Sequence, residues 1–330
     1  MNLLVTGGAG FIGSHFIESI LDDPGIDKLV NLDALTYAGN LANLEAVAGH
    51  SRYHFEHDDL RDKDAVFRIV RSHGITHVVH LAAETHVDNS IADPNAFIHT
   101  NVTGTFHVLE ACREAWGTPN SNQKPETRNL FLHVSTDEVY GSLAPDEPPF
   151  TEDSPFRPNS PYAASKAAAD HLVRSYIQTY AFPAVITRCS NNFGERQHHE
   201  KFIPTVLRCL KERKPIPLYG DGLHIRDWIH VSDHCAALRN ILVSGKTGDV
   251  FNIGAGNERT NLDLLHSLCD LFDDAHPDFG GHSRSLITHV SDRPGHDRRY
   301  AIDSSRLRQR MNTPPRSNFR DALTALVRNA

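Results

Sequence analysis

The sequence of 330 residues predicts an α/β fold, with a doubly wound parallel sheet followed by a smaller C-terminal α/β region. Two observations predict it. Short apolar runs alternate with amphipathic segments over the first 190 residues, and this rhythm stops where short, proline-rich segments begin. We therefore predict a first domain over residues 1–190, to which a later segment near 228–255 returns, and a second, ligand-covering region over residues 191–330.

Composition excludes several classes of protein. Hydrophobic residues make up 39% and charged residues 22% of the chain, which is typical of a soluble globular protein. The formal charge of -8 argues against a nucleic-acid binder. The five scattered cysteines form no C-x-x-C pair, and the histidines lack metal-ligand spacing. We expect reduced thiols in a cytoplasmic protein with no metal site, no signal peptide and no membrane span.

The first element is a strand over Asn2–Thr6, followed by the turn G-G-A-G-F-I-G and a helix. Gly7 permits the tight turn, Gly10 lets the backbone approach a pyrophosphate, and Gly13 lets the helix pack close to the strand. The start of the helix offers unpaired N–H groups and a partial positive charge to phosphates. The pattern is typical of a Rossmann-type dinucleotide site, the alternative being a glycine turn without a ligand.

A second strand over Lys28–Leu32 ends at Asp33. An acidic residue at this position suits the ribose 2′-hydroxyl of NAD and would repel the 2′-phosphate of NADP. The following residues, Ala34–Tyr37, bring no arginine to offset that repulsion. The sequence therefore predicts NAD as the cofactor.

The alternation of strands and helices continues. Further strands are expected over Tyr53–Glu56, Thr76–Leu81, Asn129–Val134 and Ala184–Arg188, helices over Asp64–Ser72, Pro94–Trp116 and Pro161–Thr179, and a surface loop over Gly117–Arg128. Ligands of a parallel sheet bind at the carboxyl ends of its strands. Asp33, Asp59, the pair Ala82 and Ala83, and the stretch 136–138 all follow strands, so we expect them to form one site.

The stretch S-T-D-E-V-Y-G carries two adjacent carboxylates, Asp137 and Glu138. The next helix places Tyr162 and Lys166 four residues apart, on one face. We expect the ammonium to lower the pKa of the phenol, so that Tyr162 removes a hydroxyl proton during an oxidation. The carboxylates then provide an acid and a base for a second step. Taken singly, Tyr162 and Lys166 could be a solvated surface pair, and Asp137 and Glu138 could be turn residues.

The second region holds the basic residues that an anionic ligand would need, Lys201, Arg226 and Arg293. The forked guanidinium groups suit phosphate oxygens. The alternative is that Arg226 pairs with Asp227 or another surface carboxylate, and both interpretations stay open.

These residues together resemble the extended short-chain dehydrogenase/reductase superfamily and, within it, the dTDP-glucose 4,6-dehydratases. The resemblance runs from Met1 to about Ser304 and rests on the motifs G-G-A-G-F-I-G-S-H, L-D-A-L-T-Y-A-G-N, S-T-D-E-V-Y-G, S-P-Y-A-A-S-K, L-Y-G-D-G-x-x-I-R-D-W, N-E-R-T-N and D-R-P-G-H-D-R-R-Y. Related epimerases keep the tyrosine and the lysine but lack the Asp–Glu pair.

The resemblance implies an NAD-dependent hydro-lyase of deoxysugar biosynthesis that converts dTDP-glucose to dTDP-4-keto-6-deoxyglucose and water. Tyr162 would take the proton of the sugar 4-hydroxyl as NAD accepts a hydride from C4, with Thr136 bonded to that oxygen and Lys166 to the nicotinamide ribose. Glu138 would then remove the C5 proton, and Asp137 would protonate the departing 6-hydroxyl. Hydride would return to C6, so that tightly bound NAD is regenerated. Burial and a neighbouring carboxylate should keep Asp137 protonated.

The glycine motif and the resemblance also imply which residues contact the cofactor and the substrate. Those to NAD are Gly7, Gly10, Phe11, Ile12, Gly13, Asp33, Leu35, Thr36, Asp59, Leu60, Leu81, Ala82, Ala83, Thr100, Tyr162, Lys166 and Asn192. Those to the nucleotide sugar are Thr85, Thr136, Asn191, Lys201, Phe202, Pro217, Leu218, Tyr219, Arg226, Asn261, Arg293 and His296. A homodimer is implied, packed through the helices over Pro94–Trp116 and Pro161–Thr179.

The chain departs from the family pattern near the sugar pocket. Thr85 replaces a usual serine, the pair His198 and His199 replaces an aromatic–proline pair, and Glu195 replaces a proline. The alternatives are a dehydratase of a UDP-, CDP- or GDP-hexose, a nucleotide-sugar 4-epimerase and a non-catalytic NAD-binding protein.

Overall fold

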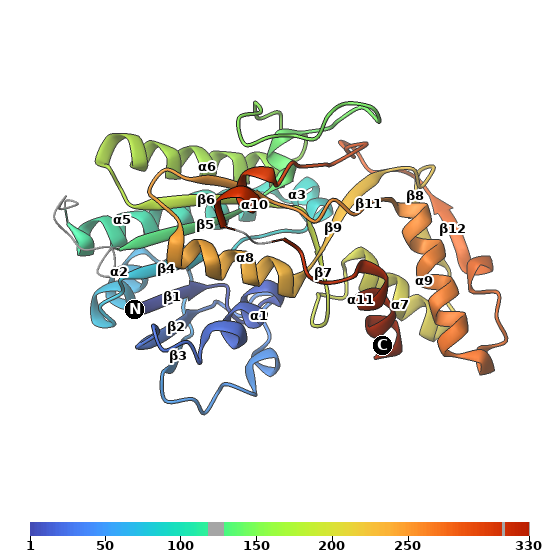
Figure 1. Cartoon of the computed structure of the whole chain (residues 1–330), viewed down its shortest axis with the longest axis horizontal. Coiled ribbons are helices and arrows are strands. Elements are labelled where there is room, and N and C mark those ends of the chain that lie inside the picture. The colour runs from blue at the N-terminus through green and yellow to red at the C-terminus, as the bar shows by residue number, and fades with distance from the viewer. Residues whose placement is uncertain (118–128, 312–313, 330) are drawn as a thin grey trace.

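The computed structural model describes residues 1–117, 129–311 and 314–329. Its centre is a seven-stranded parallel sheet in the order β10-β6-β5-β4-β1-β2-β3 (Figure 1). The strands are β1 (Asn2–Thr6), β2 (Lys28–Leu32), β3 (Tyr53–Glu56), β4 (His77–His80), β5 (Leu130–Thr136), β6 (Ala184–Cys189) and β10 (Val250–Ile253). The order turns back between β1 and β4, and this reversal opens a crevice at the carboxyl ends of the two strands.

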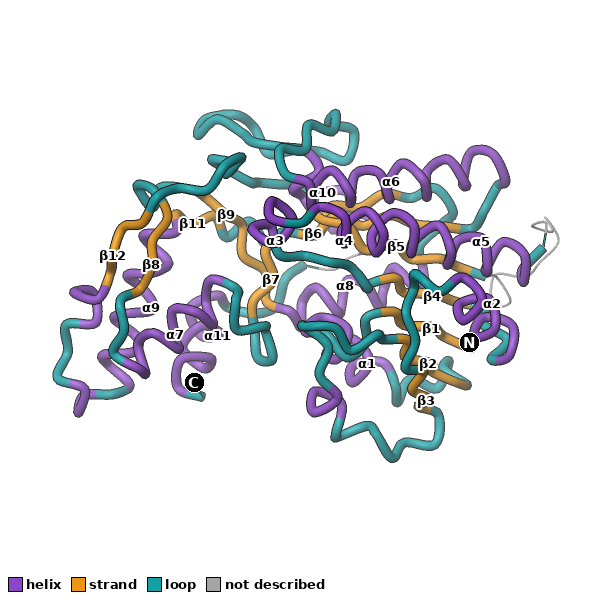
Figure 2. The backbone as a smooth tube through the Cα atoms, turned by 180° about the vertical axis from the view of Figure 1, so that it is seen from behind, coloured by secondary structure: helices purple, strands orange, loops and turns teal. Residues whose placement is uncertain are grey.

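Helices cover both faces of the sheet (Figure 2). One face is covered by α1 (Phe11–Ile20), α8 (Val231–Ser244) and α10 (Ser305–Met311), and the other by α2 (Lys63–Ser72), α5 (Thr105–Trp116) and α6 (Pro161–Tyr180). Strand β1 shows the reason, because alternate side chains point to opposite faces. Leu3 and Val5 pack with α1 and α8, whereas Leu4 packs with α2 and α5. The predicted doubly wound α/β fold is confirmed.

A smaller region lies at one end of the long axis (Figure 1). It contains α7 (Phe202–Glu212), α9 (Asn261–Ala275), α11 (Phe319–Arg328), the sheet of β8 (Ile216–Tyr219) with β12 (Ile287–Val290), and the sheet of β7 (Asn191–Phe193), β9 (Ile225–His230) and β11 (Glu258–Thr260). These elements share a hydrophobic core of their own, with Leu210, Leu264 and Phe272 at its centre. The division near residue 190 stays a prediction.

Short helices complete the fold, and one of them changes a predicted element. The expected helix over Pro94–Trp116 divides into α4 (Pro94–Phe97), a π-helix, η2 (Ile98–Gly104), and α5. A π-helix widens the turn and is common near functional sites. Here the side chain of Asn101 accepts from the backbone N–H of Glu84 and donates to Ser165 on α6. The remaining short helices are α3 (Val87–Ala92), η1 (Leu41–Leu44), η4 (Asp137–Tyr140), η5 (Pro277–Phe279) and η6 (Ser283–Leu286).

Most predicted boundaries agree with the structure to within two residues. Strand β5 runs on to Thr136, so the Ser135–Thr136 pair belongs to the strand and not to the loop. Helix α6 begins after Ser160, whose hydroxyl accepts the N–H of Ala163 at 3.1 Å and caps the helix. The expected loop after Gly117 lies almost wholly outside the described residues. Among the described helices, none has the length and apolar content needed to cross a membrane.

Candidate active site

A cavity of about 460 Å³ opens at the carboxyl ends of the central strands. It brings together the glycine turn, Asp33, Asp59 and the residues that end β4, β5 and β6. Sixteen of the predicted cofactor residues line it: Gly7, Gly10, Phe11, Ile12, Gly13, Asp33, Thr36, Asp59, Leu60, Leu81, Ala82, Ala83, Thr100, Tyr162, Lys166 and Asn192. Leu35 is the exception, because it packs against the core beneath α1.

The glycine turn has the close contacts that a dinucleotide site needs. Gly7 has a φ of +71°, and a Cβ there would lie 2.7 Å from the Cα of Ala82. A Cβ on Gly13 would lie 2.2 Å from the carbonyl oxygen of Gly7, so only glycine allows α1 to approach β1 this closely. A Cβ on Gly10 would meet only that same oxygen, at 3.3 Å, and would otherwise extend into open space. The turn therefore leaves room for a phosphate group beside Gly10.

Asp33 is fixed at the end of β2 by two backbone N–H groups. Oδ2 accepts from Ala9 at 2.9 Å, and Oδ1 accepts from Leu35 at 2.8 Å. Burial raises the pKa of Asp33, while these two hydrogen bonds lower it. The carboxylate keeps free lone pairs that can accept a ribose hydroxyl, so the residues around the turn fit NAD.

Tyr162 and Lys166 are both buried near the start of α6, with 7% and 3% of their surfaces exposed. Nζ of Lys166 donates to the carbonyl oxygen of Val134 at 2.8 Å. Burial, followed by the charge of Glu138, raises the pKa of Tyr162 well above its usual value. The expected lowering of the Tyr162 pKa is therefore wrong for the protein alone, because burial and the nearby carboxylates outweigh Lys166, whose ammonium donates to β5.

Asp137 and Glu138 follow directly from β5 in η4. The hydroxyl of Thr136 donates to Asp137 Oδ1 at 3.3 Å and accepts the N–H of Glu138 at 3.3 Å. Asp137 is 2% exposed, and Oδ2 has no hydrogen-bond partner within the described part of the chain. Burial, then the charges of Glu138 and Asp227, raises the pKa of Asp137 well above its usual value. The expected direction of this pKa is confirmed, and a protonated Asp137 can act as an acid.

The predicted cations of the second region converge on Glu138. Burial raises the pKa of Glu138, while the charges of Arg226, Arg293 and Lys201 lower it. The hydroxyl of Tyr300 donates to Asp297 Oδ2 at 2.5 Å and lies 3.4 Å from Glu138 Oε2. Burial outweighs these charges, so the pKa of Glu138 is raised overall, but less than that of Asp137; Glu138 is thus the carboxylate of the pair that loses its proton more readily, as a base requires.

Two of these cations keep hydrogen-bonding capacity for an anion. Nη2 of Arg226 and Nε of Arg293 are buried and have no hydrogen-bond partner among the described residues. The guanidinium of Arg226 lies 4.2 Å from the ring centre of Tyr300, and no ion pair joins it to Asp227 or any other described carboxylate. Buried guanidinium N–H groups without an acceptor are costly, and phosphate oxygens would satisfy them.

The predicted contacts to the nucleotide sugar do not all line this cavity. Four line the cavity, namely Thr85, Thr136, Asn191 and Lys201, whereas Phe202, Pro217, Leu218, Tyr219, Arg226, Asn261, Arg293 and His296 do not. Nζ of Lys201 donates to the carbonyl oxygen of Thr85 at 3.0 Å and so joins the second region to the loop after β4. Leu218 is fully buried in the core of the second region, so only its backbone could reach a ligand.

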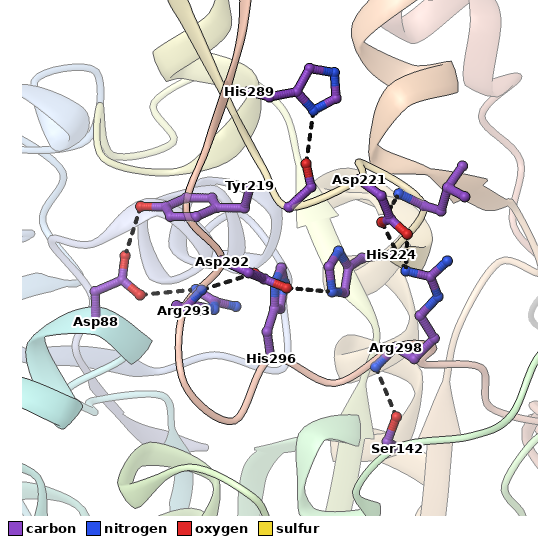
Figure 3. A network of polar contacts seen from close by, with 12 residues as sticks. Asp88, Ser142, Tyr219, Asp221, His224, His289, Asp292, Arg293, His296 and Arg298 are labelled. Carbon is purple, nitrogen blue, oxygen red and sulfur yellow. Dashed lines mark hydrogen bonds and ion pairs between the residues drawn. The ribbon is translucent and has the colours of Figure 1, made fainter.

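Around Arg293 lies a network of polar contacts, shown in Figure 3. Asp88 accepts from Arg293 Nη1 at 3.2 Å and from the hydroxyl of Tyr219 at 3.4 Å. Nδ1 of His296 lies 2.6 Å from Asp292 Oδ1, and the rings of His296 and His224 stack 3.6 Å apart. These contacts hold the loop that carries Arg293 against α3 and the end of β8.

Two groups of side chains within the described ranges place three possible metal ligands within 4.8 Å of one another. They are His198, His199 and Glu200, and His224, Asp292 and His296. In the second group the carboxylate of Asp292 is already in contact with both rings, through Oδ1 and Oδ2. That the protein holds no metal stays a prediction.

Sequence reasoning missed several residues of the site. Ser135 and Ser190 line the cavity, and the rule that ligands meet strand ends would have found them. Tyr300 and Asp227 stand in the motifs D-R-P-G-H-D-R-R-Y and I-R-D-W, but no local signal shows that they meet Glu138 and Asp137. Gln197 lines the cavity without any sequence signal.

Comparison with known proteins agrees with this geometry. Residues 4–326 match the family model described as GDP-mannose 4,6 dehydratase. A dTDP-glucose 4,6-dehydratase of Shigella flexneri is 47% identical over 335 residues, which cover 99% of this chain and 92% of the relative.

Solved structures give the same result. DesIV (dTDP-glucose 4,6-dehydratase) from Streptomyces venezuelae, with NAD and TYD bound, superposes with a TM-score of 0.90 at 43% identity, covering 99% of this chain and 96% of that one. UDP-glucose 4-epimerase of Thermus thermophilus, in complex with NAD, has a TM-score of 0.85 but only 30% identity, covering 99% and 98%. With its Asp–Glu pair and this likeness over nearly the whole chain, the protein belongs to the dTDP-glucose 4,6-dehydratases of the extended short-chain dehydrogenase/reductase superfamily.

Proposed function

We propose that the protein is an NAD-dependent hydro-lyase that converts dTDP-glucose to dTDP-4-keto-6-deoxyglucose and water. One observation carries this function: Asp137 and Glu138 lie in the same cavity as Tyr162 and Lys166. With NAD as the hydride acceptor, oxidation of a hydroxyl needs only the tyrosine and the lysine from the protein, whereas loss of water also needs a base and an acid. The family relationship supports the substrate, since relatives of this name match over almost the full chain.

The glycine turn, Asp33 and Lys166 would hold NAD. The Gly10 side of the turn would receive the pyrophosphate, and Asp33 would accept a ribose hydroxyl. NAD, when bound, supplies a hydride acceptor and a positively charged ring beside a phenol whose pKa the carboxylates otherwise raise. Lys166 keeps two ammonium protons free of its bond to Val134, and these can donate to the second ribose.

The first step would take place at the sugar 4-hydroxyl. Tyr162 would remove its proton, while the hydroxyl of Thr136 bonds the same oxygen and holds it beside the phenol. Both side chains end in the cavity and are more than nine-tenths buried, so water does not compete for the proton.

The second step would be the elimination of water. A 4-ketone acidifies the C5 proton, which Glu138 would remove, because three cations favour the ionised form of this carboxylate. Asp137 would protonate the departing 6-hydroxyl, because its raised pKa favours the protonated form. C6 would then receive the hydride taken from C4, and C5 would receive a proton, which gives the 4-keto-6-deoxy sugar. Two adjacent carboxylates thus take opposite roles, since Arg226 acts on both whereas Arg293 and Lys201 lower the pKa of Glu138 further.

We also propose that the two parts of the chain bind different ligands. Residues 1–190, with the returning segment near 228–255, would hold NAD, and residues 191–330 would hold the nucleotide through Lys201, Arg226 and Arg293. Two features support this division. Strand β10 and helix α8 belong to the large sheet and its covering layer, and the cations come from the second region.

The state and location of the protein are proposals as well. A homodimer is supported by exposed apolar side chains on α3, η2 and α5, where Ile91, Ile98 and Phe106 expose 39%, 48% and 39% of their surfaces. A cytoplasmic location is supported by the five cysteines, all of which are free thiols.

The test is mass spectrometry of the purified protein, incubated in heavy water without added NAD. Loss of one water and gain of one deuterium, fastest with dTDP-glucose, is the expected result. The same change with a UDP-, CDP- or GDP-hexose would support the dehydratase reaction and assign a different substrate. Epimer formation without loss of mass would favour the 4-epimerase, and no conversion of any sugar would contradict the enzyme altogether.

A further inference from the structure

Helix α6 carries a third polar side chain on the face that holds Tyr162 and Lys166. Asp170 follows Lys166 by four residues, so the three side chains lie in a row along the helix. Asp170 is 1% exposed and Lys166 3%, so little water separates them from the protein interior. Opposite charges attract more strongly there than at the surface. The proposed mechanism leaves Asp170 without a role.

A residue of β6 holds one oxygen of the Asp170 carboxylate, and a residue of β5 lies beside the other. Nε of Arg188 on β6 donates to Oδ2 at 2.8 Å, and Nε2 of His133 on β5 lies 3.2 Å from Oδ1. Nη1 of Arg188 also donates to the hydroxyl of Tyr140, which donates to Asn252 on β10. All of these side chains are buried, so the carboxylate has a fixed position beneath α6.

Burial and neighbouring charges shift the pKa values of the residues around Asp170 in different directions. Burial alone would raise the pKa of Asp170, but His133 and Arg188 lower it to about 2, so the carboxylate is ionised. Burial lowers the pKa of His133 and of Lys166. The ionised carboxylate of Asp170 is therefore paired with Arg188 on β6 and lies one helical turn along α6 from Lys166.

The groups that face Lys166 come from three strands and from its own helix. They are His80 on β4, His133 on β5, Cys189 on β6, and Asp170 on α6. Burial disfavours the charged forms of the two imidazoles and of the thiol, because it lowers the pKa of the histidines and raises that of Cys189 to about 12. Among the described residues around Lys166, Asp170 is thus the ionised group of opposite charge.

We propose that Asp170 is a positioning residue that keeps the Lys166 ammonium charged in the closed interior beneath the catalytic tyrosine. The proposal rests on the proposed function, in which Lys166 binds the cofactor ribose and acts beside Tyr162. Without Asp170, Lys166 and Arg188 would both lose this buried counter-charge. Arginine does not lose its proton in proteins, so Lys166 would lose its proton instead.

The test compares Asp170→Asn with His133→Asn in the full-length protein. The first variant removes the charge, whereas the second removes a neutral contact of the same carboxylate. The alkaline limb of kcat is expected to move at least one pH unit lower in Asp170→Asn, to stay in place in His133→Asn, and to return in Asp170→Glu. A limb that moves equally in both asparagine variants, or in neither, would overturn the proposal.

A second measurement does not depend on turnover. Lysine in the unfolded chain has a pKa of about 10.4. If the pKa of Lys166 in the folded protein is lower, the unfolded state binds more protons between the two pKa values, and the free energy of unfolding rises with pH over that range. The urea midpoint of Asp170→Asn should therefore lie well below that of the wild type at pH 7 and approach it by pH 10. The deficit of His133→Asn should stay constant. A constant deficit in Asp170→Asn would contradict the proposal, whereas a wild type without dehydratase turnover would contradict only the proposed function.

Discussion

At the scale of single residues, the site separates two adjacent carboxylates by their surroundings. Asp137 is enclosed and faces further carboxylates, whereas Glu138 faces three cations and the hydroxyl of Tyr300. The two residues are adjacent in the chain, so the difference between their surroundings arises from the loops that pack against each side chain. This difference makes one an acid and the other a base.

Glu138→Gln should stop the elimination but not the oxidation. The amide keeps the shape of the side chain and cannot take a proton, so water loss and exchange at C5 should fall about 100-fold or more. The 340 nm absorbance of reduced cofactor should still appear on mixing with dTDP-glucose. Glu45→Gln, at an exposed position, is the control and should behave as the wild type. Normal water loss in Glu138→Gln would mean that another group is the base.

Asp137→Asn should stabilise the fold at neutral pH. The pKa of Asp137 is raised in the folded state, so the folded protein binds this proton more tightly than the unfolded chain, whose aspartate has a pKa of about 3.9. Asp137 therefore costs stability increasingly as pH rises above that value, and costs none below it. We expect a gain of about 1 kcal/mol or more at pH 7 that disappears near pH 4.

Urea unfolding across this pH range measures that gain. Asp146→Asn, an exposed aspartate, serves as the control and should change little at any pH. Destabilisation by Asp137→Asn at pH 7 would show that the carboxylate is ionised and satisfied in the folded protein, and would remove the argument that it is the acid.

At the scale of elements, the turn between β1 and α1 shows two uses of glycine. Gly13 allows close packing of helix on strand, because a Cβ there would overlap the Gly7 carbonyl. Gly10 has space around it, so its lack of a side chain serves a ligand. The two roles can be separated by experiment.

Gly13→Ala should cost about 1–3 kcal/mol of stability, because the helix must move away from the strand. Gly10→Ala should leave the melting temperature of NAD-free protein nearly unchanged and reduce the NAD that copurifies. Thermal unfolding and the absorbance of NAD released on denaturation measure the two effects. Full NAD content in Gly10→Ala would show that the pyrophosphate does not lie beside this residue.

At the scale of the whole molecule, the apolar residues Ile91, Ile98 and Phe106 are exposed on adjoining elements of one face. If this face forms the homodimer, Phe106→Glu should produce monomers in sedimentation velocity. Val243→Glu is the matched control, because Val243 is 62% exposed on α8, which covers the opposite face of the sheet. A Phe106→Glu protein with unchanged mass in solution would place the dimer contact elsewhere or rule it out.

The sequence by itself determined the features that depend on near neighbours in the chain. Alternation of apolar runs predicted the sheet and its helices, and the spacing of Gly7, Gly10 and Gly13 predicted the cofactor turn. Tyr162 and Lys166 meet because they are four residues apart on a helix. Such contacts follow from the geometry of one strand, turn or helix. The predicted boundaries of these elements agree with the structure to within two residues, except for the helix over Pro94–Trp116, which divides into three.

The tertiary structure alone decided the features that depend on distant contacts. It gathered Lys201, Arg226 and Arg293 around Glu138 and buried Leu218 in the core. It also reversed the expected shift in the pKa of Tyr162, because burial and nearby carboxylates outweigh the lysine one turn away. The physical reason is that desolvation and long-range charge depend on everything packed around a group, which no local pattern of residues contains.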